Sequence, residues 1–385
     1  MTHRVAMFGI DHHVEIDTRS KMARFAVACL LFMVPAMIAL GGVVHGTGSS
    51  LACPDWPLCF GEAMPAMTGG IFYEHGHRLL GAAIGAMMIV LSVGLFRRER
   101  ARVKSGLTYG LGLSAVLVQL VVFGAAVSSG ALGSLWFEAL CVTVFAASVY
   151  RLASLGMSLT ALGLVGLELV VLQGLLGGLT VVWRLPPLVS TLHLAVAMAL
   201  LGILAFLALR LHPDARMGRS IAGRGLLVIA IAALSLQIVV GGFMRHTGST
   251  LACGVDLLSC QGEWWGSGGA AHTALGHRWF AIVVTGLIIA ATLPLLRAAR
   301  SSGRRAVRGL AIGSHGLVAL QVALGFLTLA FYVPVSLATL HQTLAAVLLV
   351  DLVALHVVTG PWGARFDDSV SEPVEMRGPR ALGAA

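Results

Sequence analysis

The stretch GGVVHGTGSSLACPDWPLCFGEAMPAMTGGIFYEHGHR, residues 41–78, decides the architecture of this 385-residue chain because it occurs twice. The second copy starts 200 residues later, with GGFMRHTGSTLAC at 241–253 and ALGHR at 274–278. Of the 13 positions in 41–53, 8 are identical in 241–253. The chain therefore contains an internal repeat, and the differences between its two copies can be read position by position.

The composition is that of a membrane protein. Hydrophobic residues make up 57% of the chain and charged residues only 11%, where a soluble domain carries about 25% charged residues. Runs of about 20 apolar residues are long enough to cross a bilayer as helices. We expect about ten such spans, at 24–44, 77–96, 106–128, 134–152, 160–182, 192–210, 225–243, 276–296, 309–331 and 340–360.

Lysine and arginine are concentrated in every second loop between the predicted spans. Of 26 such residues, 22 fall on one side of the predicted spans, and four fall on the other. The positive-inside rule then places both termini in the cytoplasm and 41–78 outside. The net charge of +9 reflects this bias, so it does not indicate nucleic-acid binding. The acidic residues before the first span argue against a transit peptide, so we expect a multi-pass protein of the bacterial plasma (inner) membrane.

A second repeat has a different offset. Residues 169–193 match 317–341 at 12 of 25 positions, 148 residues apart, and both copies end in Thr-Leu-His. The offsets differ by 200 − 148 = 52 residues, enough for two extra spans in the first half. We predict an all-α polytopic membrane protein with two pseudo-symmetric four-helix bundles in parallel repeat, plus an inserted two-helix hairpin.

The predicted organisation follows from these repeats. It comprises a cytoplasmic segment 1–23, a first haem-binding bundle 24–211 with its insertion at about 97–158, a second haem-binding bundle 225–360, and a disordered cytoplasmic tail 361–385. The hairpin 106–152 has no predicted role.

Four histidines recur in matched positions, each opening a span from the outer side: His77, His193, His277 and His341. A histidine within a span is costly and usually functional. Neutral imidazole is a common axial ligand of haem iron, so two facing histidines in each half predict one bis-histidine haem per half. Other histidines have no matched partner, and we expect them to lie at the interface.

The charged neighbours differ between the halves. Glu74 precedes His77 by three residues, whereas Ala274 stands at the equivalent position before His277. A carboxylate beside only one haem predicts that this half carries the chemistry, with Glu74 as acid or base. The four arginines on the outer side are candidates for binding haem propionates, because their planar fork suits carboxylates: Arg78, Arg184, Arg245 and Arg278.

Two close cysteine pairs lie in the outer loops. Cys53 and Cys59 are six residues apart, and Cys253 and Cys260 seven. Pairs on the outer face usually form disulfides, which are either structural or redox-active. The spacing does not offer the four ligands of a zinc site.

Together, GGxVxxTGSxLxCPDWPLC, YEHGHR, LQGLLGGLTV, LPPxVxTLH and the second GHR and TLHQ resemble the heme A synthase family, over about 24–360 apart from the hairpin. The resemblance implies an eight-span core that oxidises a ring methyl of heme O to a formyl group by successive hydroxylations. It implies the disulfides Cys53–Cys59 and Cys253–Cys260. His45 departs from the family, which usually has an arginine there, as at Arg245.

The resemblance also implies roles for the histidines. His77 and His193 would flank the substrate haem, and His277 and His341 would ligate the iron of a resident haem b. Heme O synthase would supply the substrate, and a haem-copper oxidase or its assembly factors would receive the product. The protein would contact membrane lipid and could form a homo-oligomer. The alternatives are a bis-haem electron carrier acting on quinol, a thiol–disulfide oxidoreductase and a transporter.

Overall fold

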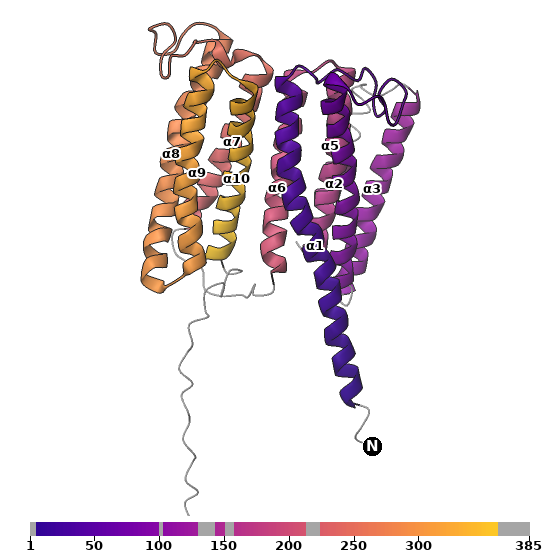
Figure 1. The fold of residues 1–385 in the computed structure, drawn as a ribbon. Coiled ribbons are helices and arrows are strands. Elements are labelled where there is room, and N and C mark those ends of the chain that lie inside the picture. Colours follow the sequence, from indigo (N-terminus) through magenta and orange to yellow (C-terminus); the bar gives the residue numbers. More distant parts are fainter. Residues whose placement is uncertain (1–4, 100–102, 130–142, 151–157, 213–223, 361–385) are drawn as a thin grey trace, which may run out of the picture.

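The computed structural model describes residues 5–99, 103–129, 143–150, 158–212 and 224–360 (Figure 1). These residues form helices joined by loops, as expected where the bilayer offers no hydrogen-bond partners to a backbone outside helices or barrels. The named elements are α1 (Val5–Gly46), α2 (Gly69–Glu99), α3 (Val103–Ser129), α5 (Leu159–Val182), α6 (Pro187–Leu211), α7 (Gly225–His246), the short 3-10 helix η1 (Ser249–Leu251), α8 (Gly269–Ser302), α9 (Arg305–Ala330) and α10 (Val335–Thr359).

The predicted class of an all-α polytopic membrane protein is confirmed. Eight of the described helices are long and apolar enough to cross a membrane, and in α1 the candidate span begins at Lys21. In the predicted hairpin, the described side chains of α3 include an apolar stretch at Tyr109–Val122. Residues 143–150 are helical, but most of the predicted span 134–152 and the tail 361–385 lie outside the described residues. The count of ten spans therefore stays a prediction.

The helices of each half pack in the same cyclic order. In the first half, α1 contacts α2, α2 contacts α5, α5 contacts α6, and α6 returns to α1. In the second half, α7, α8, α9 and α10 repeat this order. The halves lie side by side and meet through α1, α6, α7 and α10 (Figure 1). Apolar side chains of both halves form one buried core, which includes Leu30, Leu204, Leu227 and Leu352.

Helices α2, α6, α8 and α10 begin before the predicted spans. For example, α2 begins at Gly69 rather than 77, and α10 at Val335 rather than 340. The prediction that a histidine opens each span is therefore wrong. Each of the four histidines lies about two turns inside its helix. A hydropathy profile ends a span where polar residues begin. The helix itself continues through those residues, because their side chains bond to one another or to the loop.

The loops 47–68 and 247–268 cover the same end of the two halves, which we call the disulfide end (Figure 1). The turns into α6 and α10 also lie at this end. Residues before each of these helices, Arg184 with Leu185 and Tyr332 with Val333, have positive φ. A proline then precedes each helix, where its missing N–H costs no helical hydrogen bond. The repeat therefore extends to the backbone of the turns.

The inserted segment lies at the edge of the first half. Helix α3 packs on α5 and touches α2. At the far end from the disulfides, the Glu99 carboxylate of α2 accepts hydrogen bonds from the backbone N and the hydroxyl of Thr160, at 2.9 and 2.7 Å. This contact joins the last turn of α2 to the first turn of α5. The ring of four helices is thus held together across the insertion.

Candidate functional site

The first pair of histidines faces across the first half. His77 comes from α2 and His193 from α6, and their ring centroids are 6.4 Å apart with the planes inclined at 50°. Two imidazoles on opposite sides of one metal, each with its nitrogen about 2 Å from it, have ring centroids about 6 Å apart. The observed separation therefore fits one metal atom between the rings, and the prediction that these residues meet is confirmed.

The second pair lines a cavity in the second half. His277 of α8 and His341 of α10 both border a space of about 620 Å³, enclosed largely by apolar side chains. Arg245 and Arg278 also line it. A mostly apolar cavity with a few converging polar groups is the usual form of a cofactor site. The structure thus places both predicted iron ligands of this half in one such cavity.

A glycine on a neighbouring helix lies against each of the four imidazoles. A Cβ added at these glycines would lie 2.7 to 3.6 Å from the Cε1 atom of the histidine. The pairs are Gly41 with His77 (3.2 Å), Gly177 with His193 (3.6 Å), Gly241 with His277 (2.7 Å), and Gly325 with His341 (3.0 Å). The sequence analysis did not assign these glycines, although they are matched at the offsets of 200 and 148 residues.

The imidazoles fit the role of iron ligands. The Nδ1 atoms of His77, His193 and His341 are buried and have no hydrogen-bond partner within the described part of the chain. Buried polar atoms are usually paired, so these three unpaired ring nitrogens indicate a ligand that the protein itself does not supply. Neutral imidazole is an axial ligand of haem, and these residues fit one haem in each half.

Glu74 is buried beside the first pair, one helical turn from His77, and its side chain is engaged on both oxygens. Oε2 accepts a hydrogen bond from the backbone N of Cys53 at 2.8 Å, and Oε1 forms an ion pair with Arg78 at 2.6 Å. The residue is 4% exposed. The equivalent Ala274 is also buried, so the second half has no carboxylate at this position.

The arginines proposed for propionates have different surroundings. Arg78 donates to the backbone carbonyls of Asp55 (2.8 Å) and Leu58, and Arg278 to those of Thr250 (3.2 Å) and Asp256. Both therefore hold their loops. Arg245 donates to Gln342 at 2.8 Å and to the carbonyl of Gly42 at 2.9 Å, which joins the two halves. Arg184 is exposed at the turn before α6.

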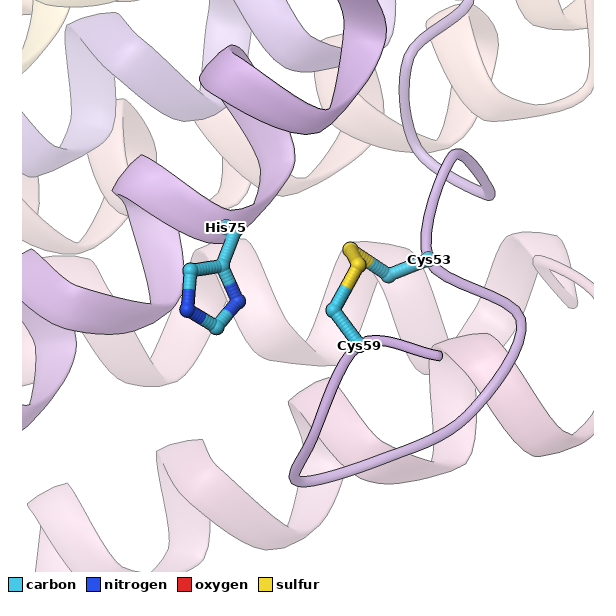
Figure 2. A group of neighbouring side chains, drawn as sticks. All are labelled: Cys53, Cys59 and His75. Atoms are coloured by element: carbon cyan, nitrogen blue, oxygen red, sulfur yellow. A yellow bond between two sulfur atoms is a disulfide. The ribbon is translucent and has the colours of Figure 1, made fainter. Parts of the chain in front are cut away.

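Both predicted disulfides are present, between Cys53 and Cys59 and between Cys253 and Cys260. Figure 2 shows His75 beside the first of them. Its Nε2 is 2.9 Å from the carbonyl of Ala63, and a ring nitrogen lies within 4.8 Å of both sulfur atoms. These sulfurs are bonded to each other, so they do not form a thiolate metal site.

Three histidines without a repeated partner, His75, His45 and His246, are more than interfacial residues. His75 is buried, whereas we expected it at the interface, and Leu275 is its equivalent in the second half. His45 of α1 contacts His246 of α7 edge to face, with centroids 4.7 Å apart. This contact lies between the halves. No sequence signal identified it, because the two residues occupy adjacent rather than equivalent positions of the repeat.

Asp55 holds the first disulfide loop. Its carboxylate accepts hydrogen bonds from the backbone N of Phe60 at 2.6 Å and of Gly61 at 2.8 Å. Burial alone raises the pKa of Asp55, but these hydrogen bonds and the nearby charge of Arg78 bring its pKa below the usual value. Asp256 accepts the corresponding bond from Gln261 at 3.0 Å in the second loop. The two loops are therefore built alike.

Comparison with known proteins agrees with this geometry. A family model described as COX15-CtaA, cytochrome oxidase assembly protein, matches residues 23–70 and 127–353, more than half of the chain. A heme A synthase of Shewanella oneidensis is 30% identical over 49% of this chain and 63% of its own length. One from Exiguobacterium sp. is 24% identical over 79% of this chain and 82% of its own, and one from Geobacillus kaustophilus is 26% identical over 71% of each. The two histidine pairs and both disulfide loops thus belong to a member of the COX15-CtaA family of cytochrome oxidase assembly proteins.

Proposed function

We propose that this protein is a heme A synthase, an oxidoreductase that converts the ring methyl of heme O into a formyl group. The proposal rests on one observation above the others: each half brings together an equivalent pair of histidines, and only the first pair has a carboxylate one turn away. Two equal haem sites would suit electron transfer alone. The carboxylate in one of them distinguishes a site for chemistry from a site for a resident cofactor.

The substrate heme O would be held by its iron between His77 and His193. Two successive hydroxylations of the methyl carbon give a geminal diol, and loss of water from the diol gives the formyl group. Each hydroxylation adds one oxygen atom, from dioxygen or water, and removes two electrons from that carbon; dioxygen or an oxidised electron carrier outside the chain would accept those electrons. Glu74 can accept or return a proton there, because its carboxylate is buried and lies one turn from His77.

The residues for a resident haem b are His277 and His341. When bound, this haem would supply one-electron transfer to or from the substrate half. The cavity of about 620 Å³ is lined mostly by apolar side chains, which would surround the haem. Arg245 lines the cavity and also bonds the Gly42 carbonyl of α1, so it links this site to the first half.

The setting of the reaction follows from the same assignment. We place the protein in the bacterial plasma membrane, with both termini in the cytoplasm and the disulfide end outside, on the charge bias of the sequence. Heme O synthase is the proposed donor of the substrate. A haem-copper oxidase or its assembly factors are the proposed acceptors of the product.

Haem extraction tests the function. The protein is expressed with a source of heme O, and the extracted haems are separated by chromatography. Wild type should yield heme A, whereas recovery of haem b and unchanged heme O alone would refute the synthase assignment.

Two variants then separate the halves. Glu74→Gln should retain haem b but accumulate heme O, and His277→Ala should lose haem b. Glu62→Gln is the matched control, because it removes an exposed carboxylate of the same loop and should leave conversion unchanged. Loss of haem b in Glu74→Gln would contradict the division of roles.

A further inference from the structure

The feature that carries a further inference is the side chain of Gln237, which lies on α7 one turn before Gly241. Its Nε2 is 3.1 Å from Nδ1 of His277 and 3.5 Å from Nε2 of the same ring, and it donates to the backbone carbonyl of His277 at 2.9 Å. The residue is buried and lines the cavity of the second half. A single amide thus contacts both the ring and the backbone of one proposed iron ligand.

The other three histidines have no such partner. Their Nδ1 atoms are buried and unpaired within the described part of the chain. At the offset of 200 residues, the first half has Met37 in place of Gln237. A second glutamine is shared by both halves: Gln173 donates to the carbonyl of His193 at 2.7 Å, and Gln321 lies 3.4 Å from Nε2 of His341. The contact at Nδ1 is therefore particular to His277.

A partner at the outer nitrogen of a ligating imidazole affects the metal. Such a partner fixes the orientation of the ring and raises its basicity, and hydrogen bonding around a haem is one means of setting its reduction potential. When Nε2 of a histidine ligates iron, Nδ1 carries the proton and needs an acceptor. Oε1 of Gln237 is buried and has no hydrogen-bond partner among the described residues, so a half-turn of the amide, which gives up the bond to the His277 carbonyl, presents an acceptor to that proton.

We propose that Gln237 is a positioning residue, which fixes the imidazole of His277 and lowers the reduction potential of the haem bound there. This inference rests on the proposed function, in which His277 ligates the resident haem. A more electron-donating ligand stabilises the ferric form, so loss of the partner raises the potential. Met37 offers no hydrogen-bond acceptor of this strength, so the substrate half lacks this hydrogen bond to its histidine.

The test uses the full-length protein with its haem. Gln237→Met places the first-half residue in the second half. The variant should retain haem, with its midpoint potential shifted upward in a redox titration. The low-temperature electron paramagnetic resonance signals of the ferric haem should also change, because the ligand ring is freed. Met37→Leu is the control at the equivalent position, and it should leave both readouts of this haem unchanged.

A second variant covers the case in which Gln237→Met fails to hold haem. Gln237→Glu keeps the shape and an acceptor oxygen, so it should retain haem with a potential at or below that of wild type. A raised potential in Gln237→Glu, or an unchanged potential and unchanged resonance signals in haem-loaded Gln237→Met, overturns the inference. If His277→Ala keeps its haem b, the proposed function fails instead, so the two failures are distinguishable.

Discussion

The close approach of Gly241 to His277 predicts a graded effect of adding one methyl group. In Gly241→Ala the new Cβ would lie 2.7 Å from Cε1 of the imidazole. Ordinary contacts begin at 3.4 Å, so the ring must move by about 3.4 − 2.7 = 0.7 Å. Overpacking of this kind costs about 1–3 kcal/mol. If the cost falls on the ligated state, haem binds roughly 5- to 150-fold more weakly, at about 1.4 kcal/mol per factor of ten.

The other three glycines make this prediction a series. A Cβ at Gly325 would lie 3.0 Å from His341, so Gly325→Ala should weaken the same haem less than Gly241→Ala does. In the first half, Gly41→Ala (3.2 Å) should weaken binding of heme O, whereas Gly177→Ala (3.6 Å) makes an ordinary contact and should be tolerated. Alanine also favours a helix over glycine by about 1 kcal/mol, so Gly177→Ala should not reduce thermal stability.

The assay is the ratio of haem to protein after purification, together with haem titration of the apoprotein. Thermal unfolding in detergent separates a local effect on the ligand from a general loss of structure. Full haem content with wild-type affinity in Gly241→Ala would refute the argument, because the ring would then not be held where the structure places it. A larger loss in Gly177→Ala than in Gly241→Ala would refute it as well.

Two predictions concern the loops. Changing both cysteines of one disulfide to serine should lower the free energy of unfolding by about 2–2.5 kcal/mol, which is the chain-entropy value for so short a loop. This holds for the pair Cys53 and Cys59 and for the pair Cys253 and Cys260, and denaturation in detergent measures it. Only loss of the first pair should also reduce heme A in extracts, because the N–H of Cys53 holds Glu74; an equal reduction from both would contradict this. The folded-state pKa of Asp55 lies below its unfolded value of about 4, so the stability that this carboxylate contributes is present above pH 4 and is lost as pH falls through the folded pKa. The protection factors of the 60–61 amides, which compare the observed exchange with the intrinsic rate at each pH, should therefore fall at acidic pH in wild type and already be reduced at neutral pH in Asp55→Asn. Full protection at neutral pH in that variant would count against the assigned bonds.

Repetition made much of this protein predictable from its sequence. A single histidine near a span end says little, but four in matched positions predicted which imidazoles face each other, and His77 and His193 do. The cysteine pairs were predictable for the same reason. The ends of the helices were not. Helix α2 extends back to Gly69 because Glu74 and Arg78 neutralise each other, which a hydropathy average cannot detect.

Contacts between different helices also could not be predicted from the sequence. The role of Gln237 depends on the distance of its amide from a ring on another helix, and nothing in its neighbours indicates that contact. The meeting of His45 and His246 likewise depends on how the halves pack. The glycines opposite the histidines are an intermediate case: the alignment of the repeats contained them, but only the packing showed what they face.

The direction of the helices has an electrostatic consequence. Helices α2, α6, α8 and α10 all begin at the disulfide end, within two turns or so of the four histidines. The N-terminus of a helix carries about half a positive charge from its aligned peptide dipoles, which favours a nearby anion by about 0.3–1 kcal/mol. Helices α1, α5, α7 and α9 end at the same side, so their negative C-termini alternate around each half with these positive N-termini. A carboxylate-bearing ligand is therefore favoured beside the starts of α2, α6, α8 and α10, and disfavoured beside His45, which lies in the last turn of α1.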